Sequence, residues 1–314
     1  MNSKALNMCN LYADVMKSVR SGDVGTFRDI LANTPREPDY DAIICGIMGR
    51  AFGYVNPDMY RVMFELGYYP KEITVSPHGE QLNGFEKFIR NITRDPVISS
   101  ADEDPNMGYI LQTFDIINAN IEGGLAGYKK IHYTWEDFAG DDDYIGYPEE
   151  IPEISYNLLN IFMDNGMLPC YEHPEVFMEF VKLGVPIPAI TIHEVVRTDM
   201  LREGECENPE CNDPDCKSGN YYVIELIPCS TIGKLIMLGW VNTLKQLYDV
   251  MPDIVIDADK YLDLYETQIE HWKSRIYNPA TGQTVFDYFS DMNFAGILAE
   301  MRDFINSVKA HNHP

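Results

Sequence analysis

The chain has 314 residues, of which 45% are hydrophobic and 12% aromatic, and this apolar content excludes general disorder. It carries 24 basic and 49 acidic side chains, a net charge of −25. No apolar stretch approaches the roughly 20 residues that span a bilayer, and the N-terminus lacks the continuous apolar run of a secretory signal. These features predict one long domain or two ordinary ones, no membrane segment and a cytoplasmic location.

The negative charge is concentrated in the middle of the chain. The net charge is −1 in residues 1–100, −11 in 101–160, −9 in 161–229 and −4 in 230–314. Proteins that bind nucleic acid neutralise phosphates with Lys and Arg, so this distribution disfavours direct binding to nucleic acid. A field of one sign attracts basic protein surfaces, although acidic loops also serve solubility alone.

Helical periodicity dominates the pattern of apolar residues. In chain order, it predicts helices over 5–19, 24–31, 40–52, 59–66, 156–163, 174–183, 190–201, 230–238, 241–250, 258–272 and 284–308. Only 221–224 is typical of a short strand. We therefore expect helical hairpins over 1–100, an acidic loop-rich insertion or linker over 101–155, and helical repeats over 156–314 with a Cys-rich acidic insertion at 203–220.

Three predicted helix ends share one local phrase. Each combines an apolar helical turn, a glycine able to adopt positive φ, and a proline that prevents the helix from resuming. The phrases are Phe64 to Pro70, Phe162 to Pro169 and Phe180 to Pro186, and their capping glycines are Gly67, Gly166 and Gly184. Short helices that end alike are typical of stacked repeats.

Several segments resemble ankyrin repeats. Val19 to Leu31 is similar to the second half of a repeat, and 278–288 resembles the opening turn and first helix, with Gly282 turning the chain and Thr284 capping the next helix. Further similar segments are 177–188 and 237–247. The resemblance implies a mostly α fold of stacked helical hairpins, an ankyrin-like α-solenoid with acidic loop insertions. Stacks with acidic insertions also resemble proteins of large DNA viruses and phages, which implies a viral protein that inhibits a host protein.

The segment from Cys206 to Cys216 repeats a five-residue unit, Cys-x-[Asn/Asp]-Pro-[Glu/Asp], and closes on a third cysteine. Three thiolates and a fourth ligand would form a structural zinc site, so we predict zinc held by Cys206, Cys211, Cys216 and Cys229, with His193 as the alternative fourth ligand. A reduced acidic loop, a disulfide and another metal remain alternatives.

The sequence contains none of the common catalytic motifs. It lacks a phosphate-binding Gly-x-x-x-x-Gly-Lys loop, a Gly-x-Ser-x-Gly elbow and a His-Glu-x-x-His helix. The nearest pattern runs from His193 to Arg197, where Arg replaces the second metal-binding His, and it indicates a histidine on a helix surface beside Glu194. A non-enzymatic role is therefore expected, with a metal-dependent enzyme built on an unrecognised carboxylate cluster as one alternative.

An acidic segment rich in tyrosine is the predicted partner-binding surface. Tyrosine contributes a large contact area with little rotamer entropy, and neighbouring carboxylates would pair with Lys or Arg of a partner. The predicted partner-binding residues are Asp141, Asp142, Asp143, Tyr144, Tyr147, Glu149 and Glu150. The expected function is a protein–protein interaction module that binds a protein with a basic surface. An acidic mimic of nucleic acid is a further alternative.

Overall fold

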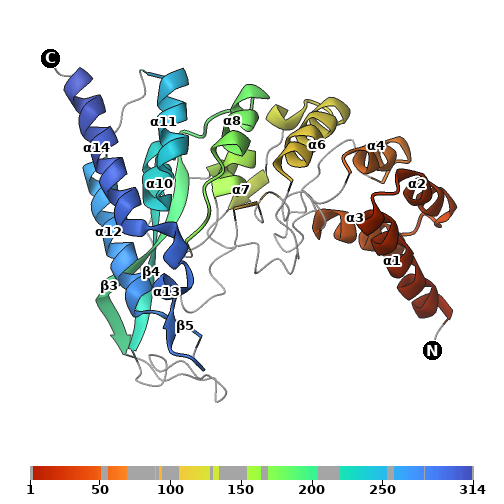
Figure 1. The fold of residues 1–314 in the computed structure, drawn as a ribbon, viewed down its shortest axis with the longest axis horizontal. Coiled ribbons are helices and arrows are strands. Elements are labelled where there is room, and N and C mark those ends of the chain that lie inside the picture. The colour runs from red at the N-terminus through yellow and green to blue at the C-terminus, as the bar shows by residue number, and fades with distance from the viewer. Residues whose placement is uncertain are drawn as a thin grey trace. The chain divides into compact units, whose positions relative to one another are not determined.

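Helices make up most of the described chain, which confirms the predicted α class (Figure 1). The computed structural model describes residues 3–50, 56–68, 89, 92–93, 106–127, 130–133, 154–163, 169–203, 220–252, 258–278 and 280–312. Two compact units divide the chain. The first comprises 1–131, 157–162 and 179–186, and the second comprises 132–156, 163–178 and 187–314.

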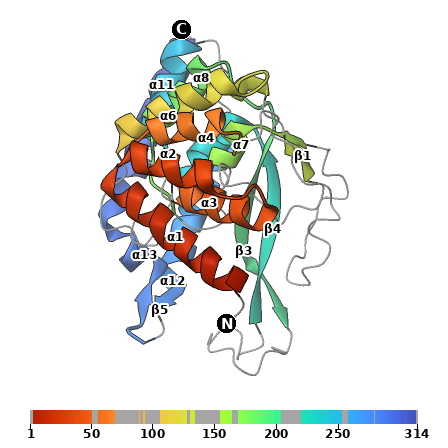
Figure 2. The same ribbon diagram turned by 90° about the vertical axis from the view of Figure 1, so that its right-hand side faces the viewer.

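The first part of the chain forms short antiparallel helices. These are α1 (Ser3–Ser21), α2 (Val24–Asn33), α3 (Pro38–Arg50) and α4 (Asp58–Glu65). Within the first unit, α1 packs against α2 and α3, and α2 packs against α4 (Figure 2). Each of these helices was predicted from its apolar periodicity.

Helix α6 (Met107–Asn120) lies within a segment that the sequence assigned to an acidic loop. Asn106 caps it by accepting a hydrogen bond from the Tyr109 amide, and Ile110, Phe114 and Ile117 form its buried face. A 3₁₀ turn, η1 (Leu125–Gly127), follows. Sequence analysis missed this helix because it has four β-branched residues and only one charge, so its intrinsic helix propensity is weak and its stability comes from burial.

Four helix ends use the same backbone geometry. Gly22, Gly67, Gly184 and Gly239 have φ between 66° and 84°, the left-handed region that glycine adopts without strain. In each case the glycine amide and the next amide bond back to the last helical turn, as in the 2.8 Å bond from the Tyr68 amide to the Met63 carbonyl. This is the Schellman arrangement, and it confirms the caps predicted at Gly67 and Gly184. The cap predicted at Gly166 lies outside the described residues.

The next elements are short. Strands β1 (Lys130–Tyr133) and β2 (Ile154–Tyr156) pair with each other, and helices α7 (Leu158–Met163) and α8 (Pro174–Lys182) follow, close to their predicted positions. In the first unit, the Phe180 ring packs at a tilt against Phe114, with ring centroids 4.7 Å apart, and meets Phe162 edge-on at 5.9 Å. This aromatic cluster connects α6 to the later helices of the unit.

A long antiparallel hairpin replaces the helix predicted over 190–201. Strand β3 (Thr191–Glu203) pairs with β4 (Asn220–Cys229), from Thr191 opposite Cys229 to Glu203 opposite Asn220, with a bulge between Arg197 and Leu201. The helical prediction is wrong because six of the nine residues from 190 to 198 are β-branched, a composition that favours strands.

The rest of the second unit is helical, apart from a small hairpin. Its elements are α10 (Thr231–Leu238), α11 (Val241–Val250), α12 (Asp259–Ser274), β5 (Ile276–Asn278), β6 (Gln283–Thr284), α13 (Val285–Tyr288), η3 (Ser290–Met292) and α14 (Phe294–Asn312). Helix α10 packs against α11 and α12, and α14 packs against α11 and α12. Both β3 and β4 contact α10, and β3 also contacts α12 (Figure 1).

The predicted turn and cap near 284 are confirmed, but the long final helix is interrupted. Gly282 has φ 70°, and Thr284 and Asp287 form a reciprocal capping box whose two backbone bonds measure 3.1 Å. The helix predicted over 284–308 breaks at Asn293, whose φ is 47°, because asparagine tolerates the left-handed conformation better than other side chains do. Among the described helices none has the length and apolar character required to cross a bilayer.

Candidate functional site

Most of the predicted site residues lie outside the described part of the chain. This applies to Asp141, Asp142, Asp143, Tyr144, Tyr147, Glu149 and Glu150, and to Cys206, Cys211 and Cys216. Of the predicted zinc ligands, the structure places only Cys229. Its side chain is buried with Ile227 and Met237 in an apolar cluster against which Tyr261 and Leu264 pack. Burial raises the pKa of the Cys229 thiol to about 11, so the side chain is neutral at physiological pH.

The geometry of the hairpin separates Cys229 from the other thiols. Nine residues of strand at about 3.3 Å each place Cys229 about 30 Å from Asn220. Cys206 follows Glu203 by three residues and Cys216 precedes Asn220 by four, so neither lies more than about 14 Å from the distal end, whatever path 204–219 takes. Cys229 therefore cannot share one zinc ion with Cys206 and Cys216. His193, opposite Ile227, lies about 23 Å from the same end, and its Nε2 is already engaged by Gln268.

A buried polar cluster of His193, Lys234 and Gln268 lies at the base of the hairpin. Sequence analysis missed Lys234 and considered His193 only as a zinc ligand or a helix-surface residue. His193 is 1% exposed, and its Nε2 lies 3.2 Å from Oε1 of Gln268 on α12. Lys234 on α10 is 2% exposed, and its Nζ donates a 2.7 Å hydrogen bond to the Ile192 carbonyl. His193 is thus a core residue of a strand, which corrects its placement on a helix surface. The available signal for Lys234 was its position as the only charged residue of α10.

The environment of His193 opposes its protonation. Burial lowers the pKa of His193 well below its usual value, the nearby Lys234 charge lowers it further, and the hydrogen bond with Gln268 acts in the opposite direction. Its Nδ1 is buried and has no hydrogen-bond partner among the described residues. The cluster therefore combines a cation and a neutral imidazole in an apolar interior. Because both groups are enclosed, this arrangement is suited to stability and switching more than to substrate chemistry.

A second cluster holds the start of α11. The Glu172 carboxylate accepts hydrogen bonds from the Thr243 amide at 2.5 Å and from the Asn242 side chain at 2.9 Å. It thereby caps a helix whose own N-cap, Trp240, supplies no side-chain bond. Burial raises the pKa of Glu172, and its hydrogen bonds oppose that shift. These contacts give Glu172 a structural role.

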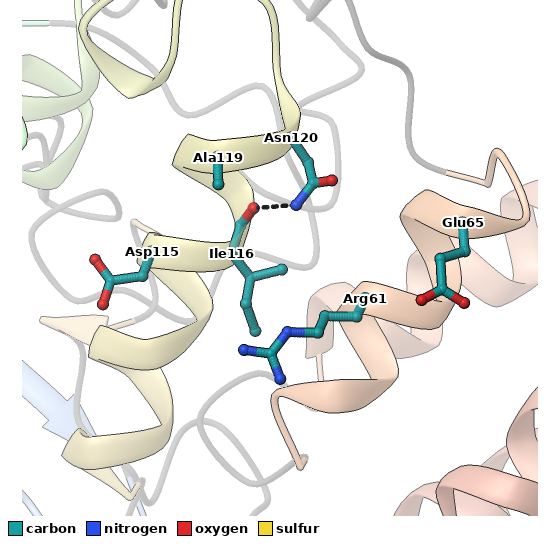
Figure 3. Close-up of a pocket in the computed structure, with 6 residues that line it drawn as sticks. All are labelled: Arg61, Glu65, Asp115, Ile116, Ala119 and Asn120. Carbon is teal, nitrogen blue, oxygen red and sulfur yellow. Dashed lines mark hydrogen bonds between the residues drawn. The ribbon is translucent and has the colours of Figure 1, made fainter.

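An open groove of about 270 Å³ lies between α4 and α6 (Figure 3). Figure 3 shows the Arg61 side chain extending from α4 toward Ile116 on α6, whereas Asp115 points away from α4. All of the lining residues except Ile116 are exposed, and they are Arg61, Glu65, Asp115, Ile116, Ala119 and Asn120.

Two of the three charged side chains that line this groove form ion pairs within the protein. Arg61 pairs with Asp58, and Glu65 accepts a 2.6 Å bond from Arg28. The lining contains no histidine, cysteine or hydroxyl nucleophile. Within the described residues, no three His, Cys, Asp or Glu side chains converge as metal ligands would. The groove is therefore suited to contact with another molecule rather than to acid–base or metal chemistry.

A cationic clamp joins consecutive hairpins of the first unit. Arg36, in the loop after α2, donates to the carbonyls of Leu66 and Gly67 at 2.7 and 2.9 Å. It also pairs with Asp41 at 3.0 Å and lies 4.1 Å from the centre of the Tyr68 ring. A cation at these carbonyls satisfies groups that the end of α4 leaves unpaired. The clamp fixes one hairpin to the next.

Comparisons with protein-family models, with curated proteins and with solved structures find no match for this chain.

Proposed function

We propose that this protein is a non-enzymatic interaction module in which helical hairpins stack as in ankyrin repeats, and that its acidic segments bind a basic surface of another protein. The observation that carries the proposal is the packing of equivalent helices. In the first unit, α1 packs on α3 and α2 on α4. In the second unit, α10 packs on α12 and α11 on α14. Each hairpin thus meets the next through matching helices, as in a repeat stack.

The helix ends support the same proposal. The four Schellman glycines end short helices in one geometry, and the Arg36 clamp ties successive hairpins through the carbonyls of such an end. Repeats that end alike present their loops along one edge, where insertions accumulate and partners bind. Residues 101–229 carry a net charge of −20, so an insertion from this region would present carboxylates to the partner.

Binding measurements with matched charge variants test the electrostatic part. One variant neutralises Asp141, Asp142, Asp143, Glu149 and Glu150 to the corresponding amides. A control neutralises five exposed carboxylates elsewhere, Asp14, Asp29, Asp249, Asp263 and Asp303. Both variants have the same net charge, so a difference between them reports a local surface rather than the overall field.

The probes are a panel of Lys/Arg-rich proteins and size-matched neutral proteins, measured at 50 and 300 mM salt. We expect binding to basic proteins only, at least tenfold weaker at the higher salt, and weakened more by the first variant than by the control. Equal effects of the two variants would reject the predicted surface. Affinity that does not change with salt would reject the electrostatic mechanism.

We also propose a structural zinc ion held by Cys206, Cys211 and Cys216, in the segment 204–219 that joins β3 to β4. The fourth ligand would then come from the same loop, where carboxylates such as Glu210 are available. Metal analysis of protein purified without chelator tests this. About one equivalent of zinc is expected, lost in the triple Cys→Ser variant and retained in Cys229→Ala. Zinc below half an equivalent in the unmodified protein would leave a reduced acidic loop.

A further inference from the structure

The base of the long hairpin is attached to the helices of the second unit through one buried face. Antiparallel pairing places Thr191, His193, Ile227 and Cys229 on the same face of the two strands, and all four are buried. Helices α10 and α12 pack against this end of the hairpin. The contacts of these buried side chains with α10 and α12 therefore hold the hairpin to the helices.

Polar contacts at the attachment are few. Gln268 of α12 bonds to His193, and Lys234 of α10 bonds to the Ile192 carbonyl. The Thr231 hydroxyl, at the start of α10, donates a 2.6 Å bond to the Pro188 carbonyl just before β3. Ile227, Cys229 and Met237 add apolar contacts, against which Tyr261 and Leu264 pack. A second charge placed in this face would thus meet the Lys234 cation with little polar material to solvate it.

We propose that protonation of His193 releases the base of the β3–β4 hairpin from α10 and α12, which makes the attachment of the hairpin a pH-sensitive switch. The proton would bind the His193 imidazole, next to the hydrogen-bonded Lys234. The repulsion between these two buried cations falls when the base of the hairpin separates from the helices and water enters. The switch does not rest on the proposed interaction function.

The charged groups around His193 on α10 and β4 offer no described anion. Lys234 is the only titratable residue of α10. From β4, Cys229 faces the same interior as a neutral thiol, because burial raises its pKa to about 11. Glu225 stands opposite Val195 in the register, and its side chain lies outside the described residues. The experiment below measures His193 directly and so includes any effect of this carboxylate.

Helix α12 contributes Gln268 as the polar partner and two tyrosines to the same region. Tyr261 packs against the Cys229 cluster, and burial raises the pKa of Tyr265, so the Tyr265 phenol remains neutral in acid. His271 lies one turn further along, and burial lowers its pKa to about 4, with a further contribution from Arg275. Lys260 is exposed at the start of the helix. No carboxylate on α12 is buried, so this helix supplies no enclosed counter-ion.

The direction of the pH effect follows from proton linkage. The folded pKa of His193 lies below the usual value of 6.5, so the released state binds a proton at a higher pH than the attached state. Attachment is therefore fully stable above pH 6.5 and weakens as the pH falls below it. One such group shifts the equilibrium about tenfold toward release for each pH unit, down to the folded pKa.

Hydrogen exchange followed by mass spectrometry on the full chain tests the proposal. Between pH 6.5 and 5.5, after correction for intrinsic exchange, the protection of amides in residues 223–229 should fall about fivefold relative to those of α14, because the released histidine is already half protonated at pH 6.5. The variant His193→Gln keeps a polar group beside Gln268 but cannot titrate, so its protection should be nearly constant. His173→Gln, which removes a histidine beside exposed Glu175, should behave as the unmodified protein does.

Two results would overturn the proposal. One is equal loss of protection in the unmodified protein and in His193→Gln, or no loss in either. The other is an imidazole pKa of 6.5 or higher for His193, measured by NMR in the unmodified protein and assigned by its absence in the variant or by through-bond correlation. The NMR titration needs only the unmodified chain, so it decides the matter even if His193→Gln does not fold.

Discussion

The two units hold their helices together in different ways. Helices α1 to α4 use charged groups at helix ends and on the surface, as in the Arg36 clamp and the Arg28–Glu65 pair. Helices α10 and α12 and the hairpin base bury charged and polar groups instead, with Lys234 and His193 both fully enclosed. The first arrangement is insensitive to pH near neutrality, whereas the second responds to a single proton.

The difference shows what polar groups contribute in each place. A clamp on a helix end has water available to either partner when it breaks, so its loss has a moderate effect. A buried lysine has no such alternative, and removing its contact leaves a carbonyl or an ammonium unsatisfied in an apolar interior. The following substitutions test this contrast.

Truncation of Lys234 should have the largest effect. Lys234→Ala leaves a cavity and an unpaired Ile192 carbonyl, and we expect a loss of about 2–4 kcal/mol in the free energy of unfolding. Lys234→Met keeps most of the volume and should lose only about 1–2 kcal/mol. All three tryptophans, Trp135, Trp240 and Trp272, belong to the second unit, so denaturant unfolding followed by tryptophan fluorescence reports this unit alone. Equal losses in the two variants would show that the hydrogen bond, not the filled volume, dominates.

A pair of glycine substitutions tests how closely the helices pack. A Cβ on Gly233 of α10 would lie 2.6 to 2.9 Å from the Tyr261 ring of α12, whereas one on Gly46 of α3 would meet nothing within 4 Å. Gly233→Ala should therefore destabilise the second unit by about 1–3 kcal/mol despite the better helix propensity of alanine. Gly46→Ala should stabilise the first unit by about 0.5–1 kcal/mol.

Circular dichroism and tryptophan fluorescence, recorded on the same denaturation series, separate these two effects. A stabilised second unit in Gly233→Ala would mean that Tyr261 moves aside, and the close α10–α12 packing would then be dispensable.

Sequence patterns predicted turns and helix caps well, because these features depend on neighbouring residues. Gly67 is followed by Tyr-Tyr-Pro at a helix end, and Thr284 is followed three residues later by Asp287, so each cap is encoded within a few positions. The hairpin base is different. His193 and Gln268 are 75 residues apart, and their pairing depends on how β3 docks on α12. Helical spacing also misled the prediction over 190–201, because β-branched composition outweighed periodicity there.

The candidate site was predictable only in part. A run of carboxylates predicts an acidic surface, and a repeated Cys-x-[Asn/Asp]-Pro unit predicts thiols that lie close together. Sequence order could not show that Cys229 lies about 30 Å from the distal end of the hairpin, because that distance arises from strand pairing. Nor could it distinguish the buried Lys234 from an exposed lysine, since burial is decided by the elements that pack around α10.

The clamp in the first unit should have an intermediate effect. Arg36→Ala removes the hydrogen bonds to the Leu66 and Gly67 carbonyls together with the Asp41 pair, and we expect a loss of about 1–2 kcal/mol in the first unit. Arg36→Lys keeps the charge but loses the planar fork, so it should recover less than half of that loss. The loss should appear in circular dichroism while tryptophan-detected unfolding stays unchanged. A shift in the tryptophan signal would show instead that the two units unfold together.

Removing the capping box before α13 should have the smallest effect on the free energy of unfolding, although both of its hydrogen bonds are formed. Thr284→Ala removes the acceptor for the Asp287 amide, and helix caps of this kind contribute about 1 kcal/mol. Hydrogen bonds from Thr284 lower the pKa of Asp287, so the contribution of this carboxylate is present above pH 4 and is lost as the pH falls through its depressed folded pKa. Thr284→Ser retains the hydroxyl and serves as the control. Because α13 is a single turn on the surface, the cap should change hydrogen exchange at 285–288 more than it changes global unfolding, and an equal change in both would indicate that α13 unfolds with the core.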